Sequence, residues 1–258
     1  MSALATQIRT LARRSALKTL RQPFQLFPIV FFPLILFAIN GSALSKATAI
    51  PHFPTHSYRA FLLAFPFVQG AMFVSISAGT SLGRDIETGF LNRLALTPLR
   101  TDAMLVGQLG GAFVLGIVQA IVYLLVAFAI GVGFASGAGG VIVLLLLSLT
   151  ISFAFASLGG LLALRLGSGE AVQGIFPLLF VTLFLSSSSL PRNLIKVDWF
   201  REIATYNPVS YLIEGVRSLI ITGWDGQALG LAFAVALTIG VSSVALASWA
   251  MTQRMART

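Results

Sequence analysis

The sequence predicts an all-helical membrane protein with six transmembrane helices. Of the 258 residues, 57% are hydrophobic and only 10% are charged, whereas a soluble domain uses roughly 25% charged residues to cover its surface. Six apolar runs have about the 20 residues that a helix needs to cross a bilayer, and the basic residues concentrate on one predicted side of them. A soluble enzyme and a disordered chain are therefore excluded.

The six runs follow one another without a second domain or a long linker, so residues 1–258 are predicted to form a single transmembrane domain. The third run is long enough to tilt or to extend past the bilayer. The fifth run contains Pro177. The expected spans are Leu26–Leu44, Tyr58–Leu82, Ala103–Val132, Gly140–Leu164, Ala171–Ser188 and Gln227–Met251.

Residues 1–24, before the first run, do not have the pattern of a cleavable signal peptide. Arg14, Lys18 and Arg21 fall on one side of a helical projection, and the other side is apolar. This pattern predicts an amphipathic helix that lies on the membrane surface, with a plain basic tail as the alternative. The apolar side consists of Leu4, Ile8, Leu11 and Ala12.

The distribution of Lys and Arg predicts the orientation of the chain. If both termini are cytoplasmic, that side holds eleven basic residues and the opposite side holds six. Cytoplasmic segments of membrane proteins carry the excess of Lys and Arg. Both termini are therefore expected in the cytoplasm, and the net charge of +9 reflects topology and anionic lipid rather than nucleic acid.

The sequence lacks the residues expected for ATP binding, and it gives little support for metal binding or ion coupling. None of the three lysines follows a glycine, so the chain has no phosphate loop for ATP. His52 and His56 lie four apart in a proline-rich segment, where a solvated loop is favoured over a metal site. The centres of the six runs lack charged residues, which argues against an ion-coupled carrier because such carriers usually need one.

Close helix packing is indicated by small residues four apart, since these let helices approach in lipid. Gly79 and Gly83 form one such pair, and Gly107 and Gly111 form another. Packing within the subunit is favoured over a contact between two subunits.

The connection between the second and third runs predicts a short amphipathic helix over residues 84–98. Ile86, Phe90 and Leu94 are spaced four apart and would share one face. Two acids lie near its expected start, where the helix dipole favours them, and the Thr97-Pro98 pair ends it. The apolar face needs either the bilayer surface or a partner protein to cover it.

The connection between the fifth and sixth runs, residues 189–226, is 38 residues long and apolar in character. Asn207-Pro208 would divide it into two short helices, and Glu214 and Arg217 could pair because they are three apart. Short apolar helices outside a full span suggest a re-entrant hairpin, which needs protein or a water-filled cavity around its backbone.

These two connections resemble those of type-2 ABC exporter permeases of the drug and antibiotic export branch. The first is similar to the family's cytoplasmic signature, from which Phe90 and Asn92 depart. The second is similar to the family's outer segment through Pro191, Asn207, Pro208, Glu214 and Arg217. The signature positions are Asp85, Glu87, Gly89, Leu91, Leu94, Thr97, Pro98 and Leu99.

The resemblance implies a permease subunit in the cytoplasmic (inner) membrane, not an enzyme. It would pair with a second permease, identical or homologous, and with two copies of an ABC ATPase that binds ATP and Mg²⁺; this chain itself would hold no cofactor. The coupling helix that docks into the ATPase would include Asp85, Glu87, Gly89, Phe90, Leu91, Leu94, Thr97 and Pro98.

The implied substrate is hydrophobic or amphipathic: a drug, an antibiotic or a lipid. Candidate positions along its path are Gln69, Phe73, Gln173 and Phe180. Three alternatives remain open at this point: a permease for a polysaccharide or glycolipid, an ion-coupled secondary carrier, and a membrane scaffold that transports nothing.

Overall fold

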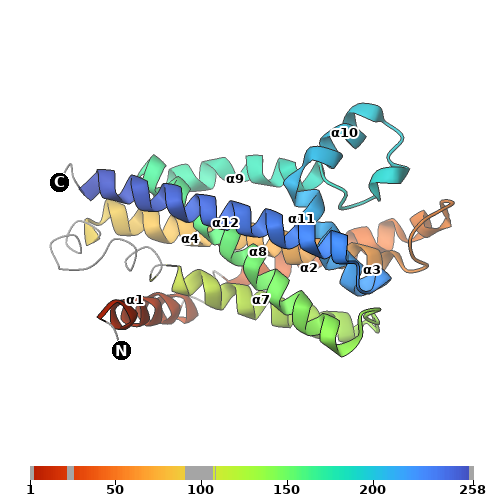
Figure 1. Cartoon of the computed structure of the whole chain (residues 1–258), viewed down its shortest axis with the longest axis horizontal. Coiled ribbons are helices and arrows are strands. Elements are labelled where there is room, and N and C mark those ends of the chain that lie inside the picture. Colours follow the sequence, from red (N-terminus) through yellow and green to blue (C-terminus); the bar gives the residue numbers. More distant parts are fainter. Residues whose placement is uncertain (1–2, 22–25, 91–106, 108, 256–258) are drawn as a thin grey trace.

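The computed structural model describes residues 3–21, 26–90, 107 and 109–255, and the regular elements in these ranges are helices. The longer helices lie side by side along the long axis of the molecule (Figure 1). Their bounds are α1 (Ala3–Leu20), α2 (Leu26–Ala43), α4 (Ala64–Glu87), α7 (Gly110–Ala129), α8 (Gly137–Leu166), α9 (Gly169–Phe184) and α12 (Gly226–Met255).

Shorter helices lie between the long ones at one end of the bundle (Figure 1). They include two 3-10 turns and one π-helical turn. Their bounds are η2 (Ser45–Ala49), α3 (Tyr58–Leu62), η3 (Arg192–Leu194), α10 (Asp198–Tyr206), α11 (Pro208–Arg217) and η4 (Ser218–Thr222).

Five of the described helical segments are long and apolar enough to cross a membrane: residues 26–43, 58–87, 110–129, 137–166 and 226–253. The segment that contains α4 is the central one, because 83% of its apolar window is buried against 22% for α12. In the fifth predicted span, α9 has only 16 residues, about 24 Å at 1.5 Å per residue. This is shorter than a hydrocarbon core of roughly 30 Å, so the six-span arrangement stays a prediction.

The predicted boundaries agree with the helices at most ends. The fifth run was expected to continue to Ser188, but α9 ends at Phe184. The third run was expected from Ala103; α7 begins at Gly110, and residues 103–106 lie outside the described residues.

The second predicted span is interrupted and longer than expected. A turn at Leu63 separates α3 from α4, and α4 continues to Glu87. Pro66 provides the physical reason for the turn, because it has no amide hydrogen for the carbonyl of Leu62 and its ring crowds that carbonyl. The carbonyl of Phe61 lies at the same turn and accepts a hydrogen bond from another part of the chain.

Glycines bring α4 into backbone contact with α8 and α9. A Cβ atom at Gly159 would lie 1.9 Å from the carbonyl oxygen of Ser75, and one at Gly79 would lie 2.7 Å from the carbonyl oxygen of Gly159. A Cβ atom at Gly83 would lie 2.5 Å from the amide nitrogen of Gly169. The expectation that Gly79 and Gly83 serve packing within the subunit is therefore confirmed.

The N-terminal helix α1 is formed as predicted, but its described apolar residues do not lie free on the bilayer surface. Leu11 and Ala12 pack against Gly107 and Gly110 at the start of α7, and Ser15 Oγ accepts a hydrogen bond of 3.1 Å from the amide of Gly111. The glycines remove the side chains that would hold the helices apart. Leu11 and Ala12 therefore face α7, and the position of α1 on the membrane surface stays a prediction.

The two ends of the bundle carry different elements. The end of α4 at Glu87, the end of α12 and helix α1 lie at one end, and α3 and α10 lie at the other (Figure 1). His52 and His56 are exposed in the irregular segment 50–57 near the second end. This segment is non-helical, as the prolines predicted.

Candidate functional site

The predicted coupling helix does not begin at residue 84. Arg84–Glu87 form the last turn of α4, Thr88 follows it, and Gly89 has a φ of +66° before Phe90 becomes helical again. A positive φ is accessible to glycine without strain, so the chain changes direction here. Ile86 and Phe90 therefore do not lie on one continuous helix, contrary to the predicted stripe.

Four predicted docking residues, Leu91, Leu94, Thr97 and Pro98, lie outside the described residues. The structure places the other four, Asp85, Glu87, Gly89 and Phe90, where α4 meets α1 and α9. We call this meeting point the α4 junction.

Asp85 points into the α4 junction rather than away from it. Asp85 is only 5% exposed. Its Oδ2 lies 3.9 Å from Nη1 of Arg14 in α1. The guanidinium of Arg14 also lies over the ring of Phe90, 3.9 Å from its centroid. A single arginine thus contacts the residues on both sides of Gly89.

Glu87 contacts a different helix. Its Oε1 accepts a hydrogen bond of 3.0 Å from the amide of Gly169, the first residue of α9. The preceding residue, Ser168, accepts from the amide of Ala171 as the side-chain cap of α9. A carboxylate at this position satisfies an amide that has no partner within the helix and interacts favourably with the helix dipole.

The outer connection is organised around Asn207, at the start of α11. Its Nδ2 donates to the carbonyls of Thr182, at 2.6 Å, and Leu185, at 3.1 Å, which lie at the end of α9. Its Oδ1 accepts from the amide of Val209, with Pro208 as the first residue of α11. The Asn-Pro pair divides the connection as predicted, and it also provides partners for carbonyls at the end of α9.

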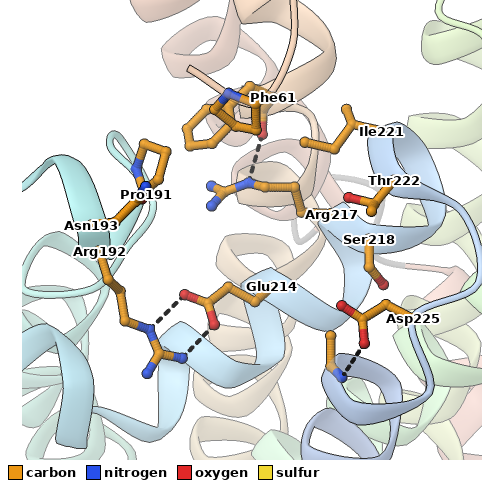
Figure 2. Close-up of a pocket in the computed structure, with 12 residues that line it drawn as sticks. Phe61, Pro191, Arg192, Asn193, Glu214, Arg217, Ser218, Ile221, Thr222 and Asp225 are labelled. Atoms are coloured by element: carbon orange, nitrogen blue, oxygen red, sulfur yellow. Dashed lines mark hydrogen bonds and ion pairs between the residues drawn. The ribbon is translucent and has the colours of Figure 1, made fainter. Parts of the chain in front are cut away.

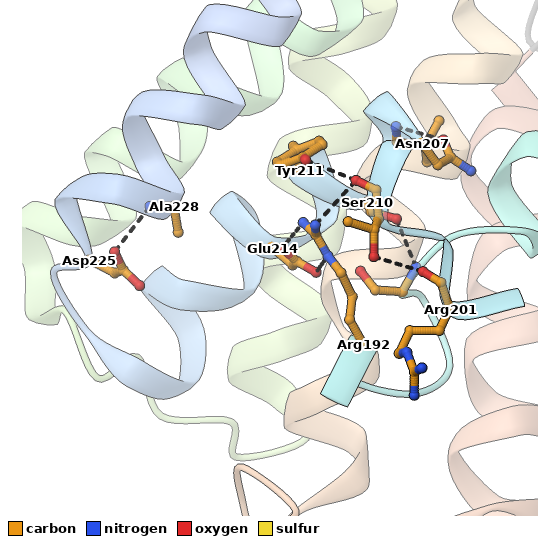
Figure 3. Close-up of polar contacts among 11 residues, drawn as sticks. Arg192, Arg201, Asn207, Ser210, Tyr211, Glu214, Asp225 and Ala228 are labelled. Atoms are coloured by element: carbon orange, nitrogen blue, oxygen red, sulfur yellow. Dashed lines mark hydrogen bonds and ion pairs between the residues drawn. The ribbon is translucent and has the colours of Figure 1, made fainter. Parts of the chain in front are cut away.

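Glu214 pairs with Arg192, not with Arg217 as predicted (Figure 3). Arg192 Nε donates to Glu214 Oε1 at 2.6 Å, and its Nη2 donates to Oε2. The Arg192 guanidinium also lies 4.4 Å from the ring centroid of Tyr211. Burial alone would lower the pKa of Arg192, but its hydrogen bonds and the charge of Glu214 raise it overall.

Arg217 is 6% exposed and has carbonyl and aromatic partners instead of a carboxylate (Figure 2). Its Nε donates to the carbonyl of Phe61 at 3.1 Å, and its Nη2 donates to the carbonyl of Ser188 at 2.9 Å. The guanidinium lies 3.6 Å from the ring centroid of Phe61. Arg217 thus joins the interruption in the second span to the segment after α9.

A cavity of about 380 Å³ lies beside these two arginines (Figure 2). Arg192, Glu214 and Arg217 line it together with Pro191 and Asp225. Three of the five predicted outer residues, Pro191, Glu214 and Arg217, are thus brought together, whereas Asn207 and Pro208 line a separate pocket near Trp199. Asp225 Oδ1 also accepts hydrogen bonds of 3.0 Å from two amides at the start of α12.

The candidate path residues separate into three environments. Phe73 of α4 and Phe180 of α9 contact each other, with ring centroids 5.8 Å apart, and both are partly exposed. Gln173 is exposed on α9, whereas Gln69 is fully buried inside the bundle. The two phenylalanines therefore lie on an accessible face in this conformation, and Gln69 does not.

Phe73 and Phe180 belong to a larger aromatic face shared by α2, α4 and α9. Phe32 contacts Phe73 at 5.5 Å between centroids, and Phe176 contacts Phe180 at 4.8 Å. Ring contacts of this kind connect the following residues: Phe32, Phe73, Phe176, Phe180 and Phe184.

Sequence reasoning missed Arg14, Gly169 and Arg192 as partners of the predicted residues. Arg14 and Gly169 are far from Asp85 and Glu87 in the chain, and Arg192 is 22 residues from Glu214. Local periodicity carries no signal for such pairs. The sequence offered one signal. The outer connection contains several acidic residues and several arginines, so Glu214 had more than one possible ion-pair partner.

Comparison with known proteins identifies the family. A model of the ABC-2 type transporter family matches residues 6–221, which is most of the chain. The chain belongs to this family. The resemblance to type-2 ABC permeases is thereby confirmed, and this ABC-2 permease is a multi-pass membrane protein.

Curated relatives of this ABC-2 permease carry transport names. It is 29% identical over 204 residues to a daunorubicin resistance ABC transporter permease protein, DrrB1, from Streptomyces coeruleorubidus, covering 77% of this chain and 69% of the relative. It is 25% identical over 228 residues to the putative transport permease ycf38 of Porphyra purpurea, covering 85% and 76%. The ycf38 protein of Cyanophora paradoxa is 27% identical over 211 residues, covering 81% and 72%.

Proposed function

We propose that this ABC-2 permease is the membrane subunit of an exporter that moves a hydrophobic or amphipathic compound out of the cytoplasm. The energy comes from ATP hydrolysis in a separate ABC ATPase, present in two copies with ATP and Mg²⁺. The observation that carries the proposal is the family match together with the end of α4 at Glu87 and the positive φ of Gly89 inside the predicted docking segment.

The ATPase contact falls on the segment that begins at Gly89 and Phe90. Support comes from the position of Gly89: in the part of the chain that the structure describes, a Cβ atom there would meet nothing within 4 Å. None of the described neighbours therefore blocks a partner protein at this position. ATP binding closes the ATPase dimer, and the coupling segments carry that movement into the membrane helices.

The aromatic face of α2, α4 and α9 forms one wall of the substrate path in a dimer of two permeases. Two properties of this face support the role. Its rings contact one another, and they are partly exposed; Phe32, for example, is 40% exposed. Aromatic side chains bind apolar and planar compounds through large contact areas. The drug named in the Streptomyces relative makes an amphipathic aromatic substrate the first choice over a glycan.

Both termini face the cytoplasm in this proposal, α9 is the fifth of six spans, and the 189–226 segment forms a re-entrant hairpin before the sixth span at α12. The positive-inside bias supports the orientation. Exposed aromatic residues at the end that carries α10 support its position at the outer interface, since Trp and Tyr concentrate there. Examples are Trp199, 61% exposed, and Tyr206, 78% exposed.

The docking proposal is tested by co-expressing the full chain with its partner ABC ATPase. Gly89→Asp and Leu94→Asp are expected to abolish co-purification of the ATPase and transport, because each places a charge in an apolar contact. Gly131→Asp is the matched control, since Gly131 also has a positive φ (+74°) and nothing near its Cβ position. Retention of ATPase and transport in both docking variants would show that the assignment is wrong.

The substrate class is tested with inverted membrane vesicles and daunorubicin, the compound in the relative's name. ATP-dependent uptake that is reduced by Phe73→Ala and Phe180→Ala supports the path. Transport that needs a proton gradient and no ATP would instead favour a secondary carrier. Stimulation of the ATPase by a polysaccharide or glycolipid but not by daunorubicin would overturn the substrate class and leave the permease role intact.

A further inference from the structure

The two acids at the end of α4 contact other helices of the same chain. Successive residues in a helix are separated by about 100°, so Asp85 and Glu87 point in directions about 200° apart. Two carboxylates on nearly opposite sides cannot form one patch for a single partner. They contact α1 through Arg14 and α9 through Gly169 instead.

The contact of Asp85 with Arg14 and that of Glu87 with Gly169 can each fix the position of α4 relative to a neighbouring helix. Asp85 is 5% exposed, and a carboxylate out of water is stable when an opposite charge and donors accompany it. Glu87 accepts from the first amide of α9, where the helix dipole adds to the hydrogen bond. The glycines at positions 83 and 169 bring the backbones of α4 and α9 together at the same level.

Arg14 extends this connection past the direction change. Its guanidinium is close to Asp85 before Gly89 and to the ring of Phe90 after it. A cation over an aromatic ring is attracted electrostatically, more strongly where water is partly excluded. Phe90, in the docking segment, thus contacts Arg14 of α1. Arg14 in turn contacts Asp85 of α4, and Glu87 of α4 contacts α9.

We propose that Asp85 and Glu87 are positioning residues that fasten α4 to α1 and α9, so that a displacement of the docking segment at Phe90 moves the three helices together. Their role is transmission, not contact with the ATPase. This inference rests on the proposed function, since it assigns a task to the same segment. It replaces the expectation that all signature residues face the ATPase.

The first experiment separates association from coupling. Arg14→Gln, Asp85→Asn and Glu87→Ala are expressed with the ATPase, and both co-purification and the amount transported per ATP hydrolysed are measured. We expect the ATPase to co-purify as with the original chain and the coupling ratio to fall about fivefold or more, the lower end for coupling between sites. Glu87→Gln, which keeps an acceptor for the Gly169 amide, is expected to recover most of the ratio.

Matched controls come from neighbouring exposed residues. Arg13→Gln on α1 and Glu170→Ala in the first turn of α9 remove the same kinds of charge from exposed positions. We expect neither to change the coupling ratio. Loss of ATPase association in a folded Asp85 or Glu87 variant would overturn the proposal, and so would an unchanged coupling ratio.

The second experiment needs no ATPase. Amide hydrogen exchange of the purified full chain is measured at the start of α9. Faster exchange at Gly169 in Glu87→Ala, but not in Glu87→Gln or Glu170→Ala, supports the fastening contact. Unchanged exchange in Glu87→Ala would overturn it. If the original chain binds no ATPase while this exchange effect is present, the proposed function fails and the contact between α4 and α9 stands.

Discussion

Single glycines determine how closely α4 approaches its neighbours. Gly159 of α8 lies where the backbone of α4 passes, so even one methyl group would overlap the carbonyl oxygen of Ser75. Gly174 of α9 is also helical, but a Cβ atom there would meet nothing within 4 Å. The same residue type thus has opposite structural importance at two positions.

Gly159→Ala is expected to lower the free energy of unfolding by about 1–3 kcal/mol, since overpacking forces the helices apart. Gly174→Ala is the control, expected to be neutral or to stabilise by up to about 1 kcal/mol through the better helix propensity of alanine. Thermal unfolding of both variants in the same detergent checks this. Equal melting temperatures for the two variants would contradict the close contact of α4 and α8.

At the scale of elements, the outer connection is held by contacts between segments that are separated in sequence. Arg192, next to Pro191, forms a bidentate ion pair with Glu214 of α11. Arg201 and Asp198 form another pair, three residues apart on α10, with side chains 48% and 87% exposed. Water screens the second pair much more than the first.

A double-mutant cycle of Arg192→Ala and Glu214→Ala is expected to give a coupling energy of about 1 kcal/mol, at the top of the range for partly exposed pairs. The Arg201→Ala and Asp198→Ala cycle is expected to give a value near zero. Chemical unfolding in detergent measures both. A larger coupling in the α10 pair than in the Arg192 pair would contradict the structure of the outer connection.

For the whole molecule, the charge bias alone predicts which end of the helix bundle faces the cytoplasm. The end that carries α1 and the ends of α4 and α12 (Figure 1) is the end predicted to face the cytoplasm from eleven basic residues against six. Lys46 belongs to η2, which lies at the opposite end of the bundle together with α3.

The orientation can be tested without background because the chain has no cysteine. In intact cells, a membrane-impermeant maleimide is expected to label Lys46→Cys, and to label Arg13→Cys only after permeabilisation. Both positions are exposed in the structure, so a difference in labelling reports the side of the membrane. The reverse pattern would overturn the assignment of cytoplasmic termini.

The sequence was most informative where a property is local. Hydrophobic length located five of the spans to within a few residues, except at the start of α7, and the Asn207-Pro208 pair located the start of α11. The non-helical backbone of the segment with His52 and His56 was predicted from its prolines. Positions 91–98 of the docking segment stay a prediction because they lie outside the described residues.

The sequence by itself determined the membrane class, the family and the approximate spans, because these depend on composition, run length and short motifs. Only the tertiary structure decided which charges meet: Glu214 with Arg192 rather than Arg217, and Asp85 with Arg14. It also showed that α4 extends to Glu87 and that Gly89 ends it. The physical reason is that an ion pair or a capped helix end needs only spatial proximity, which sequence spacing specifies within one helix and not between helices.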